Sequence, residues 1–402
     1  MSFDARARAV TVLGLAQTLA WASSYYLPAM LAAPMARDLG ISVPTVFAAF
    51  SSALVVSALL GPYAGRAIDR WGGRPVLMGT NLVFALGLAG LGIAQGPVGM
   101  FAAWLVLGIA MGGGLYEAAF AALVRLYGQH SRGAITGVTL FAGFASTVGW
   151  PLSTFLEAHI GWRGACFAWA ALHLVLGLPL NALLPRATAI AAPTADQQLA
   201  VDDTPAPATP ARAAYLLSLV FAVTWFTSTA MAAHLPRLLM AGGATLAAAV
   251  LVGSLVGPAQ VAARLLEFGF LRRLHPLFSA RIATLMHPLG ALLLAVFGAP
   301  AAALFGVLHG AGNGILTIAK GTLPLVIFGP VGYGHRQGVL MVPARIAQAF
   351  APWLFGLCLD RWGVGALCLS AALGIVAFGA LLALPRLNEP RRLAPTAPAS
   401  NA

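Results

Sequence analysis

Long apolar runs separated by short polar segments recur along the whole chain of 402 residues. Each run is close to the length, about 20 residues, at which an α-helix crosses the hydrocarbon core of a bilayer. Glycine and proline in the polar segments break the helical pattern between runs. The pattern predicts an all-α membrane protein with twelve transmembrane helices, at 10–32, 44–65, 75–95, 98–124, 135–158, 165–185, 214–236, 244–266, 279–298, 301–328, 338–359 and 364–385.

The composition favours a membrane protein over a soluble one. Charged residues make up 8% of the chain and the mean hydropathy is +0.87, whereas a soluble chain carries about 25% charged residues. Three widely separated cysteines, Cys166, Cys358 and Cys368, form neither a disulfide framework nor a metal site. The sequence also has no Ser-His-Asp constellation, so we expect no enzyme, no cofactor and no metal.

The placement of the basic residues predicts the orientation. Sixteen arginines lie at one set of alternate loops and termini, and only Arg37, Arg163, Arg237 and Arg361 lie at the other set. Loops that carry an excess of arginine stay on the cytoplasmic side of the membrane. The bias predicts a multi-pass protein of the plasma (inner) membrane with both termini in the cytoplasm. It also explains the net charge of +12 without a nucleic-acid partner.

The two halves of the sequence echo each other. "WASS" at 21–24 matches "WFTS" at 225–228 with an offset of 204, and "GGGL" at 112–115 matches "GNGI" at 312–315 with an offset of 200. Two parallel six-helix halves form a transporter architecture, in which the substrate binds between the halves near the bilayer midplane. We expect an N-terminal six-helix bundle at 1–186, a flexible cytoplasmic linker at 187–213, a C-terminal six-helix bundle at 214–386 and a cytoplasmic tail at 387–402.

The loop between the second and third runs carries an unusual cluster of charge. Over 65–74 it reads Gly-Arg-Ala-Ile-Asp-Arg-Trp-Gly-Gly-Arg. This resembles the signature of the major facilitator superfamily in the same loop: a glycine, three residues, Asp-Arg, one residue, a glycine and then basic residues. The chain departs from the signature at Gly73, where a basic residue is common, and at Pro75. With the twelve runs, the repeat and the central linker, the motif implies the superfamily's fold of two pseudo-symmetric six-helix bundles.

The resemblance implies that this loop is a cytoplasmic latch, with gating roles for Gly65, Asp69, Arg70 and Arg74. The chemistry suits that role, because a carboxylate near a helix end can pair with arginines and with the positive N-terminus of a neighbouring helix. The alternative is that the arginines only set the topology, although a topology signal needs no Asp69. Glu267 occupies the repeat position of Asp69 and is the gating candidate of the second half.

Polar side chains follow one face of several predicted spans. The resemblance implies that spans one, four, seven and ten line a central cavity. The polar residues of span ten fall within about 80° of one another at 100° per residue. The cavity candidates are Gln17, Trp21 and Tyr25 on span one, Ser228 on span seven, and His309 and Asn313 on span ten. A lone His309 is a weak proton site, and we expect His173 and His287, on peripheral spans, to pack between helices.

Four ionisable residues lie well inside predicted spans: Glu117, Arg264, Lys320 and Arg345. Each lies eight or nine residues from a cytoplasmic helix end, which is about 12–14 Å deep at 1.5 Å per residue. Because such a side chain costs several kcal/mol in the membrane, it faces a partner or water. Three positive charges and one carboxylate at a shared depth predict an anion-binding cavity. Two alternatives stay open: Arg264 belongs to the second latch, or Glu117 forms a static ion pair.

The leading hypothesis is a secondary transporter that moves a small organic anion, of carboxylate type, by alternating access. Basic residues on spans eight and eleven are similar to those of the oxalate/formate and monocarboxylate branch. The alternative is a proton-driven exporter of drugs or metabolites, with Glu117 as the proton carrier. The expected partners are the small-molecule substrate and the lipid bilayer, with protons as an open option, and we expect a monomer. The soluble parts are too short for a membrane receptor or scaffold.

Overall fold

A computed structural model of the chain describes residues 3–186, 210–270 and 274–384, and every regular element within these ranges is a helix. The predicted linker at 187–213 falls largely outside the described residues, although helix α11 already begins at Pro210. The predicted tail at 387–402 also lies outside them. The all-helical fold class predicted from the apolar runs is confirmed.

The N-terminal half breaks its helices where the sequence supplies glycine or proline. Three glycines precede the extended residue Leu115, which separates α5 from α6. Gly161 turns α8 back on itself with φ of 70°, a left-handed value that glycine adopts without steric cost. The elements are α1 (Phe3–Ser23), α2 (Leu27–Asp38), α3 (Val43–Trp71), α4 (Gly73–Ile93), α5 (Pro97–Gly114), α6 (Tyr116–Tyr127), η1 (Gly128–Ser131), α7 (Arg132–Ala142), α8 (Ala145–Leu172), η2 (His173–Gly177) and α9 (Leu178–Ala182).

The C-terminal half begins two of its helices with side-chain caps. The Thr245 hydroxyl accepts the backbone N–H of Ala248 at the start of α12, and His275 Nδ1 accepts that of Leu277 at the start of α13. Each cap satisfies a backbone donor that the first helical turn leaves unpaired. The elements are α11 (Pro210–Ala241), α12 (Leu246–Gly269), α13 (Pro276–Phe297), η4 (Ala299–Ala301), α14 (Ala302–Phe328), α15 (Tyr333–Trp362), η5 (Gly363–Gly365) and α16 (Ala366–Leu382).

Eight stretches of the described chain are long and apolar enough to cross a membrane. Two of them hold more than one helical segment: Pro97–Ala182 has 86 residues and Tyr333–Leu382 has 50. The first of these turns back at Gly161 and again around η1, and the second is divided by η5. A multi-pass membrane fold is therefore confirmed, while the count of twelve crossings stays a prediction.

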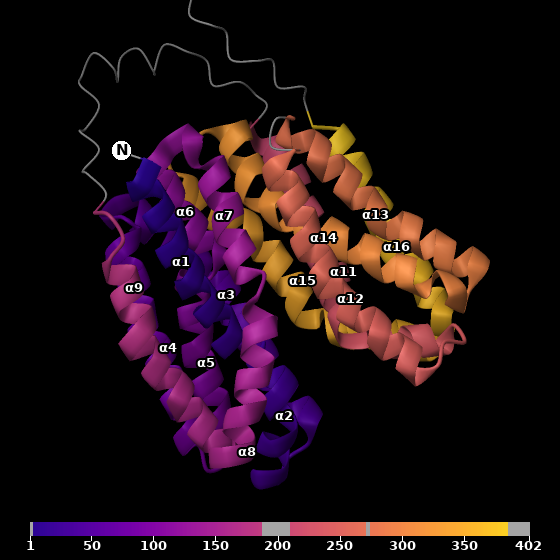
Figure 1. The fold of residues 1–402 in the computed structure, drawn as a ribbon, viewed down its shortest axis with the longest axis horizontal. Coiled ribbons are helices and arrows are strands. Elements are labelled where there is room, and N and C mark those ends of the chain that lie inside the picture. Colours follow the sequence, from indigo (N-terminus) through magenta and orange to yellow (C-terminus); the bar gives the residue numbers. More distant parts are fainter. Residues whose placement is uncertain (1–2, 187–209, 271–273, 385–402) are drawn as a thin grey trace, which may run out of the picture.

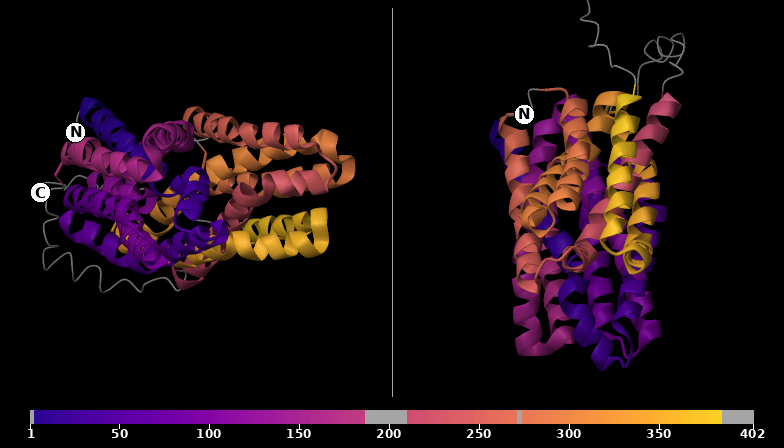
Figure 2. Two further views of the ribbon diagram at one scale, coloured as in Figure 1. Left: turned by 90° about the horizontal axis from the view of Figure 1, so that it is seen from below. Right: turned by 90° about the vertical axis from the view of Figure 1, so that its right-hand side faces the viewer.

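The two halves lie side by side and meet most closely at one end of the molecule (Figure 1). This closed end holds the ends of α3 and α12 and the starts of α7 and α15; the halves diverge toward the opposite end. The view from below in Figure 2 separates the same two groups of helices. The buried core of the N-terminal half continues into Leu340 and Met341 of α15, whereas Phe305 and Phe355 belong to a separate core within the C-terminal half.

Glycines bring α14 close to two neighbouring helices. A Cβ atom on Gly310 would lie 2.6 Å from the carbonyl oxygen of Val256 in α12, and one on Gly312 would lie 2.7 Å from that of Ala283 in α13. Neither distance is compatible with a real side chain. The run "GAGNG" at 310–314 therefore packs helices together, as small residues do in membrane bundles. This close packing holds the polar residues of α14 against α11 and α13.

Candidate functional site

A buried ion pair joins the two halves of the molecule. Glu117 Oε2 lies 2.7 Å from Arg345 Nη2, and the two side chains are 15% and 4% exposed. Glu117 lies in the first turn of α6, which begins inside the predicted fourth span because Leu115 interrupts the helix. The pair brings together two of the four charged residues that the sequence predicted to share a depth. Only one of the three basic residues is paired with that carboxylate.

A chain of hydrogen bonds runs on from this ion pair. Arg345 Nη1 donates to Gln348 Oε1 at 3.2 Å, and Gln348 Nε2 donates to the Tyr25 hydroxyl at 3.0 Å. That hydroxyl lies 3.5 Å from Thr229 Oγ1 on α11. The chain links α6, α15, the turn after α1, and α11. It fixes the Arg345 guanidinium, which leaves a substrate less side-chain entropy to offset on binding.

Lys320 is the least compensated charge at this centre. It is 5% exposed, and its Nζ lies 3.8 Å from the centroid of the Trp225 ring. Its ammonium group makes no hydrogen bond or ion pair with any residue that the structure describes. A desolvated cation–π contact contributes about 2 kcal/mol, whereas burying an ammonium costs several kcal/mol. The ammonium can therefore bind an anion.

Two tryptophans at equivalent positions of the internal repeat meet at this site. The rings of Trp21 and Trp225, whose positions differ by the repeat offset of 204, lie 6.3 Å apart and 8° from parallel. Tyr25 and Thr229 differ by the same offset and also meet. Arg345 Cζ lies 5.9 Å and 5.2 Å from the two indole centroids. The charged centre therefore lies where corresponding positions of the two halves face each other.

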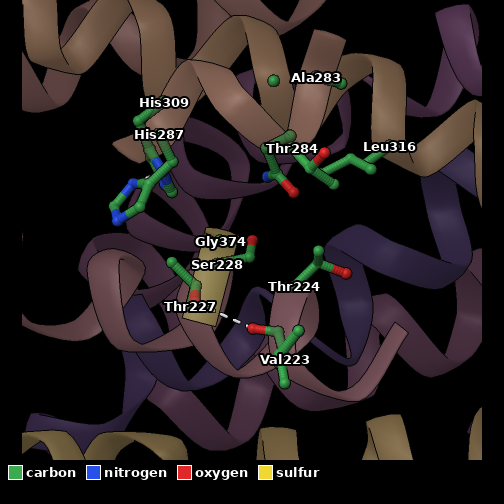
Figure 3. A pocket seen from close by; sticks show the side chains of 12 residues that line it. Val223, Thr224, Thr227, Ser228, Ala283, Thr284, His287, His309, Leu316 and Gly374 are labelled. Atoms are coloured by element: carbon green, nitrogen blue, oxygen red, sulfur yellow. Dashed lines mark hydrogen bonds between the residues drawn. The ribbon is translucent and has the colours of Figure 1, made fainter. Parts of the chain in front are cut away.

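Three of the predicted cavity residues lie in a different place. Ser228, His309 and Asn313 line a partly open pocket of about 30 Å³ whose lining residues come from α11, α13, α14 and α16, all in the C-terminal half (Figure 3). The residues lining this pocket do not include Lys320 or Arg345. The sequence analysis placed the polar residues of this pocket and those of the charged centre in one cavity, because residues of both groups lie on one face of α14.

Two further candidates make contacts of their own. Gln17 Nε2 donates to the carbonyl oxygen of Gly114 at 2.7 Å, so it supports the break between α5 and α6. Arg264 Nη1 donates to the carbonyl oxygen of Thr139 at 3.0 Å and thereby joins α12 to α7. This contact places Arg264 between the halves, and its interaction with the Tyr116 hydroxyl also places it beside the charged centre. The choice between a cavity role and a latch role for Arg264 stays open.

Asp69 bridges the halves at the closed end. Its two carboxylate oxygens accept the backbone N–H groups of Gly334 and His335 at 2.9 Å and 2.8 Å. These amides belong to the first turn of α15, where the helix dipole also favours a negative charge. A Cβ on Gly334 would lie 2.8 Å from Asp69 Oδ1, and one on Gly65 would overlap the backbone of Gly334. The backbones are in direct contact here.

We call the contact of Asp69 with the start of α15 the first closure between the halves. Glu267 makes the second closure. Its Oε1 lies 2.8 Å from Arg132 Nη2, and the side chains are 3% and 21% exposed. Arg132 is the first residue of α7, and its Nη1 also donates to the carbonyl oxygen of Leu274 at 2.7 Å. This contact joins the end of α12 to the start of α7. Both acidic residues that the sequence placed at equivalent repeat positions therefore contact the opposite half.

Comparison with known proteins identifies the family of this chain. The profile of the Major Facilitator Superfamily matches residues 13–318. The chain belongs to the major facilitator superfamily. An uncharacterised 38 kDa protein encoded in the 23S RNA operon of Thermoproteus tenax is 30% identical over 365 residues, covering 89% of this chain and 90% of that protein.

Solved structures of superfamily transporters share the fold. The human organic anion transporter MFSD10 (TETRAN) matches with a TM-score of 0.72 and 18% identity over 94% of this chain and 99% of its own. The proton:xylose symporter XylE matches with a TM-score of 0.73 and 13% identity over 95% and 96%. The fucose:proton symporter FucP of E. coli matches with a TM-score of 0.72 and 14% identity over 94% of this chain and 98% of its own. The superfamily consists of transporters, so this chain is a secondary transporter of small molecules within a membrane.

Arg70 and Arg74 of the superfamily loop make no hydrogen bond or ion pair with the opposite half among the described residues. Arg70 is exposed, with its Cζ 5.8 Å from the Trp71 ring. Arg74 is half-buried and forms no hydrogen bond or ion pair within the described part of the chain. Arg125 instead approaches the loop, where its Nε donates to the carbonyl oxygen of Asp69 at 3.2 Å. The gating roles of Arg70 and Arg74 remain predictions for this superfamily member.

Several residues at these sites were absent from the sequence-based candidates. Trp225 was detectable, because the "WFTS" repeat match pairs it with Trp21. Gln348 and Arg132 carry no local signal that separates them from other polar residues near helix ends. Gly334 contributes a backbone amide and a close approach, and neither feature depends on a side chain that could be recognised in the sequence.

Proposed function

We propose that this superfamily member transports a small organic anion of carboxylate type by alternating access. The observation that carries the proposal is the buried Lys320 ammonium, which packs on Trp225 without a carboxylate partner in the described chain. Arg345 lies over the same ring and supplies a second, fork-shaped donor. A carboxylate bound between these two cations would compensate the charge that Glu117 alone leaves uncompensated.

Alternating access follows from the contacts between the halves. Asp69 and Glu267 hold the closed end, and the ion pair of Glu117 with Arg345 joins the halves at mid-depth. The arginine bias predicts that the closed end is cytoplasmic, so the conformation is an outward-facing one. A substrate anion that competes with Glu117 for Arg345 would weaken the mid-depth contact and allow the halves to move.

A thermal-shift experiment on the purified protein tests the substrate class. Small carboxylates should raise the melting temperature, because a ligand that binds the native state stabilises it, and lipophilic cations should not. Lys320→Ala should lower carboxylate affinity by about 30- to several-thousand-fold, the usual effect of removing one partner of a desolvated charge pair. Lys320→Arg should retain part of the affinity.

Thr322→Ala is the matched control, because Thr322 is also buried on α14 and its hydroxyl only bonds back to Ile318 within the helix. This variant should bind carboxylates like the wild type. Unchanged carboxylate binding by both Lys320→Ala and Arg345→Ala would refute the anion site.

The second candidate is a proton-driven exporter of drugs or metabolites. Its supporting observation is the aromatic wall near Glu117, where Trp21 lies 4.8 Å from Tyr116 and 5.2 Å from Tyr25 between ring centroids. Aromatic faces bind organic cations, and a carboxylate can carry the exchanged proton. Stabilisation by lipophilic cations, together with loss of their export in Glu117→Gln, would favour this candidate over the anion transporter.

We also propose that both termini face the cytoplasm in a plasma (inner) membrane, as the arginine bias predicts. Gln129 lies exposed near the closed end, and Gln95 lies exposed between α4 and α5 at the other end. In a background without the three native cysteines, Gln129→Cys should resist a membrane-impermeant maleimide in intact cells, and Gln95→Cys should react. The reverse pattern would invert the topology.

A further inference from the structure

Two buried histidines face each other across α13 and α14 in the C-terminal half. His287 Nδ1 and His309 Nδ1 lie 3.0 Å apart, and the residues are 7% and 6% exposed. Phe305 flanks both rings, with centroids 5.5 Å from His287 and 6.1 Å from His309. The distance is that of a hydrogen bond, so one Nδ1 carries a proton and donates it to the lone pair of the other.

This pair leaves one buried nitrogen without a partner. His287 Nε2 is fully enclosed and has no hydrogen bond among the described residues. If His287 donates through Nδ1, its Nε2 is a bare lone pair; if His309 donates, His287 Nε2–H is an unused donor. Burying an unpaired polar nitrogen costs free energy in either tautomer. The two imidazoles are therefore not fully satisfied as a purely structural pair.

A buried histidine in the other half shows the contrasting arrangement. His173 Nε2 lies 2.7 Å from the Ser23 hydroxyl, and His173 Nδ1 lies 2.8 Å from Asn81 Oδ1. Both ring nitrogens are used, and Phe84 stacks on the ring at 4.7 Å. His173 is accounted for as a packing residue, as the sequence suggested. The sequence also predicted His287 to be a packing residue, but its Nε2 has no hydrogen-bond partner among the described residues.

Both histidines line the partly open pocket between α11, α13, α14 and α16 (Figure 3). Hydroxyl groups of Thr227, Ser228 and Thr284 line this pocket, and so does Asn313. The pocket, of about 30 Å³, has room for a water molecule. Most of its lining surface is apolar, and the Thr227 and Thr284 hydroxyls already donate to carbonyl oxygens of their own helices. A water molecule in the pocket would lie beside the imidazoles and could carry a proton to them.

No acidic side chain lies among the residues that line this pocket. On α14 the nearest charge is Lys320, eleven residues on and about 16 Å along the helix. On α13 it is Arg281, six residues earlier, which is bound to the carbonyl oxygen of Leu381 in α16. On α11, His234 lies 2.7 Å from the carbonyl oxygen of Pro352 in α15. On α12, Arg264 and Glu267 lie farther along toward the closed end.

We propose that the His287–His309 pair binds one proton, which the two imidazoles share through an N–H⁺···N hydrogen bond. A proton from pocket water adds to the free lone pair of the donor imidazole, after which both Nε2 atoms carry hydrogen. The charge-assisted bond between the rings is stronger than the neutral one. A second proton is opposed by the first, because the two rings are in contact. This proton site is separate from Glu117, and it does not depend on the substrate being an anion.

The test is proton uptake by the full-length protein in lipid nanodiscs without any substrate. The probe is the proton itself, counted by potentiometric titration from pH 8 downward over the range in which the fold is retained. His287→Gln, His309→Gln and the double variant should each take up one proton fewer per molecule than the wild type. His173→Gln, which removes a fully partnered imidazole, should take up the same number as the wild type.

Nitrogen-15 spectra of histidine-labelled wild-type protein give a readout that needs no variant to fold. A scalar coupling across the Nδ1–H···Nδ1 bond, with both imidazoles shifting in one common step, is expected. The proposal is overturned by imidazoles that stay neutral until the protein unfolds. It is also overturned by a double variant that loses two protons, since that result means two independent sites.

Discussion

The two closures between the halves occupy equivalent places in the internal repeat but use different chemistry. Asp69, at the end of α3, binds backbone amides at the start of α15. Glu267, at the end of α12, binds the guanidinium of Arg132 at the start of α7. Each joins the second predicted span of one half to the fifth predicted span of the other. The acidic position contacts the opposite half in both repeats, but its partner is backbone in one repeat and a side chain in the other.

Because one closure binds backbone amides and the other binds a side chain, we expect the two to tolerate different amounts of movement between the helices. The amide closure works only if α3 and α15 are in backbone contact, which the pair Gly65 and Gly334 permits. The guanidinium of Arg132 is carried on a long side chain, which can adjust to a small relative movement of α12 and α7 before the ion pair is lost. We therefore expect the first closure to be the more easily broken by a small steric change.

The largest effect should come from Gly334→Ala. The added Cβ would lie 2.8 Å from Asp69 Oδ1 and overlap the Gly65 carbonyl group, while alanine is a better helix former than glycine in α15. Overpacking of this kind costs about 1–3 kcal/mol, which is roughly a 5- to 150-fold shift toward the open state. Spin labels at the exposed positions Trp71 and Val331 should report a longer distance between the halves.

Gly79→Ala is the matched control, because a Cβ on Gly79 in α4 meets nothing within 4 Å. It should leave the distance between the labels and the transport rate unchanged. A wild-type distance in Gly334→Ala would show that the closed end adapts to the added methyl group, and that the backbone contact is not what sets this closure.

Asp69→Asn should have the second-largest effect. The amide keeps the size of the side chain and one acceptor, but it loses the charge that faces the positive end of α15. Replacing charge-assisted hydrogen bonds by neutral ones costs about 1–2 kcal/mol, or roughly 5- to 30-fold in the closed population. The same spin-label pair measures the shift, and substrate affinity should stay near that of the wild type.

Asp38→Asn is the control for that substitution, because Asp38 forms an ion pair with Arg163 within the N-terminal half. It should leave the closed population unchanged. An identical distance distribution in Asp69→Asn and the wild type would reduce Asp69 to part of a topology signal.

Glu267→Gln should open the closed end less than Asp69→Asn does. We expect the closed population to shift by about 3- to 10-fold. Arg132 keeps its hydrogen bond to Leu274, and glutamine still offers an oxygen to the guanidinium. Spin labels that span α12 and α7 measure this closure. Because the two closures share no residue, the effects of Asp69→Asn and Glu267→Gln should add in the double variant. Strong non-additivity would show that they open as one unit.

The sequence predicted the fold for a clear physical reason, and it singled out buried charges whose role as an anion site stays a prediction. Apolar runs of membrane length leave few alternatives to a helical bundle, and charges such as Glu117, Lys320 and Arg345 inside those runs are too costly to lack a purpose. The two acidic closures also followed, because Asp69 and Glu267 stand in sequence contexts that repeat. These predictions rest on the free-energy cost of burying a charge in the membrane and on positions in the sequence repeat. Both can be recognised without knowing any tertiary contact.

The division of the polar stripe on α14 could not be predicted from its periodicity. His309 and Lys320 share a helical face, but the neighbours of that face change with depth: α13 and α11 enclose the histidine, whereas Trp225 covers the lysine. The amides that bind Asp69 were also hidden, because backbone N–H groups belong to every residue. Only the packing of α15 against α3 selects Gly334 and His335 for that contact.

The smallest effect that we predict is a pH dependence of the second closure. Partial desolvation lowers the pKa of His275 below its ordinary value of 6.5, and the charges of Arg132 and Arg281 lower it further. The closed arrangement thus favours neutral His275, whose Nδ1 accepts the Leu277 N–H at the start of α13. The stability that this neutral ring gives to the closure is complete above pH 6.5 and is lost as the pH falls below that value.

Acidification from pH 8 to 5.5 should therefore loosen the contact between α12 and α7 slightly, and leave that between α3 and α15 in place. The effect is small because the His275 side chain is largely exposed to solvent. His275→Asn keeps a capping side chain without a titrating group, so the spin-label distance across α12 and α7 should become independent of pH in this variant. If the distance still changes with pH in His275→Asn, the sensitivity belongs to another group, and the difference between the closures does not extend to pH.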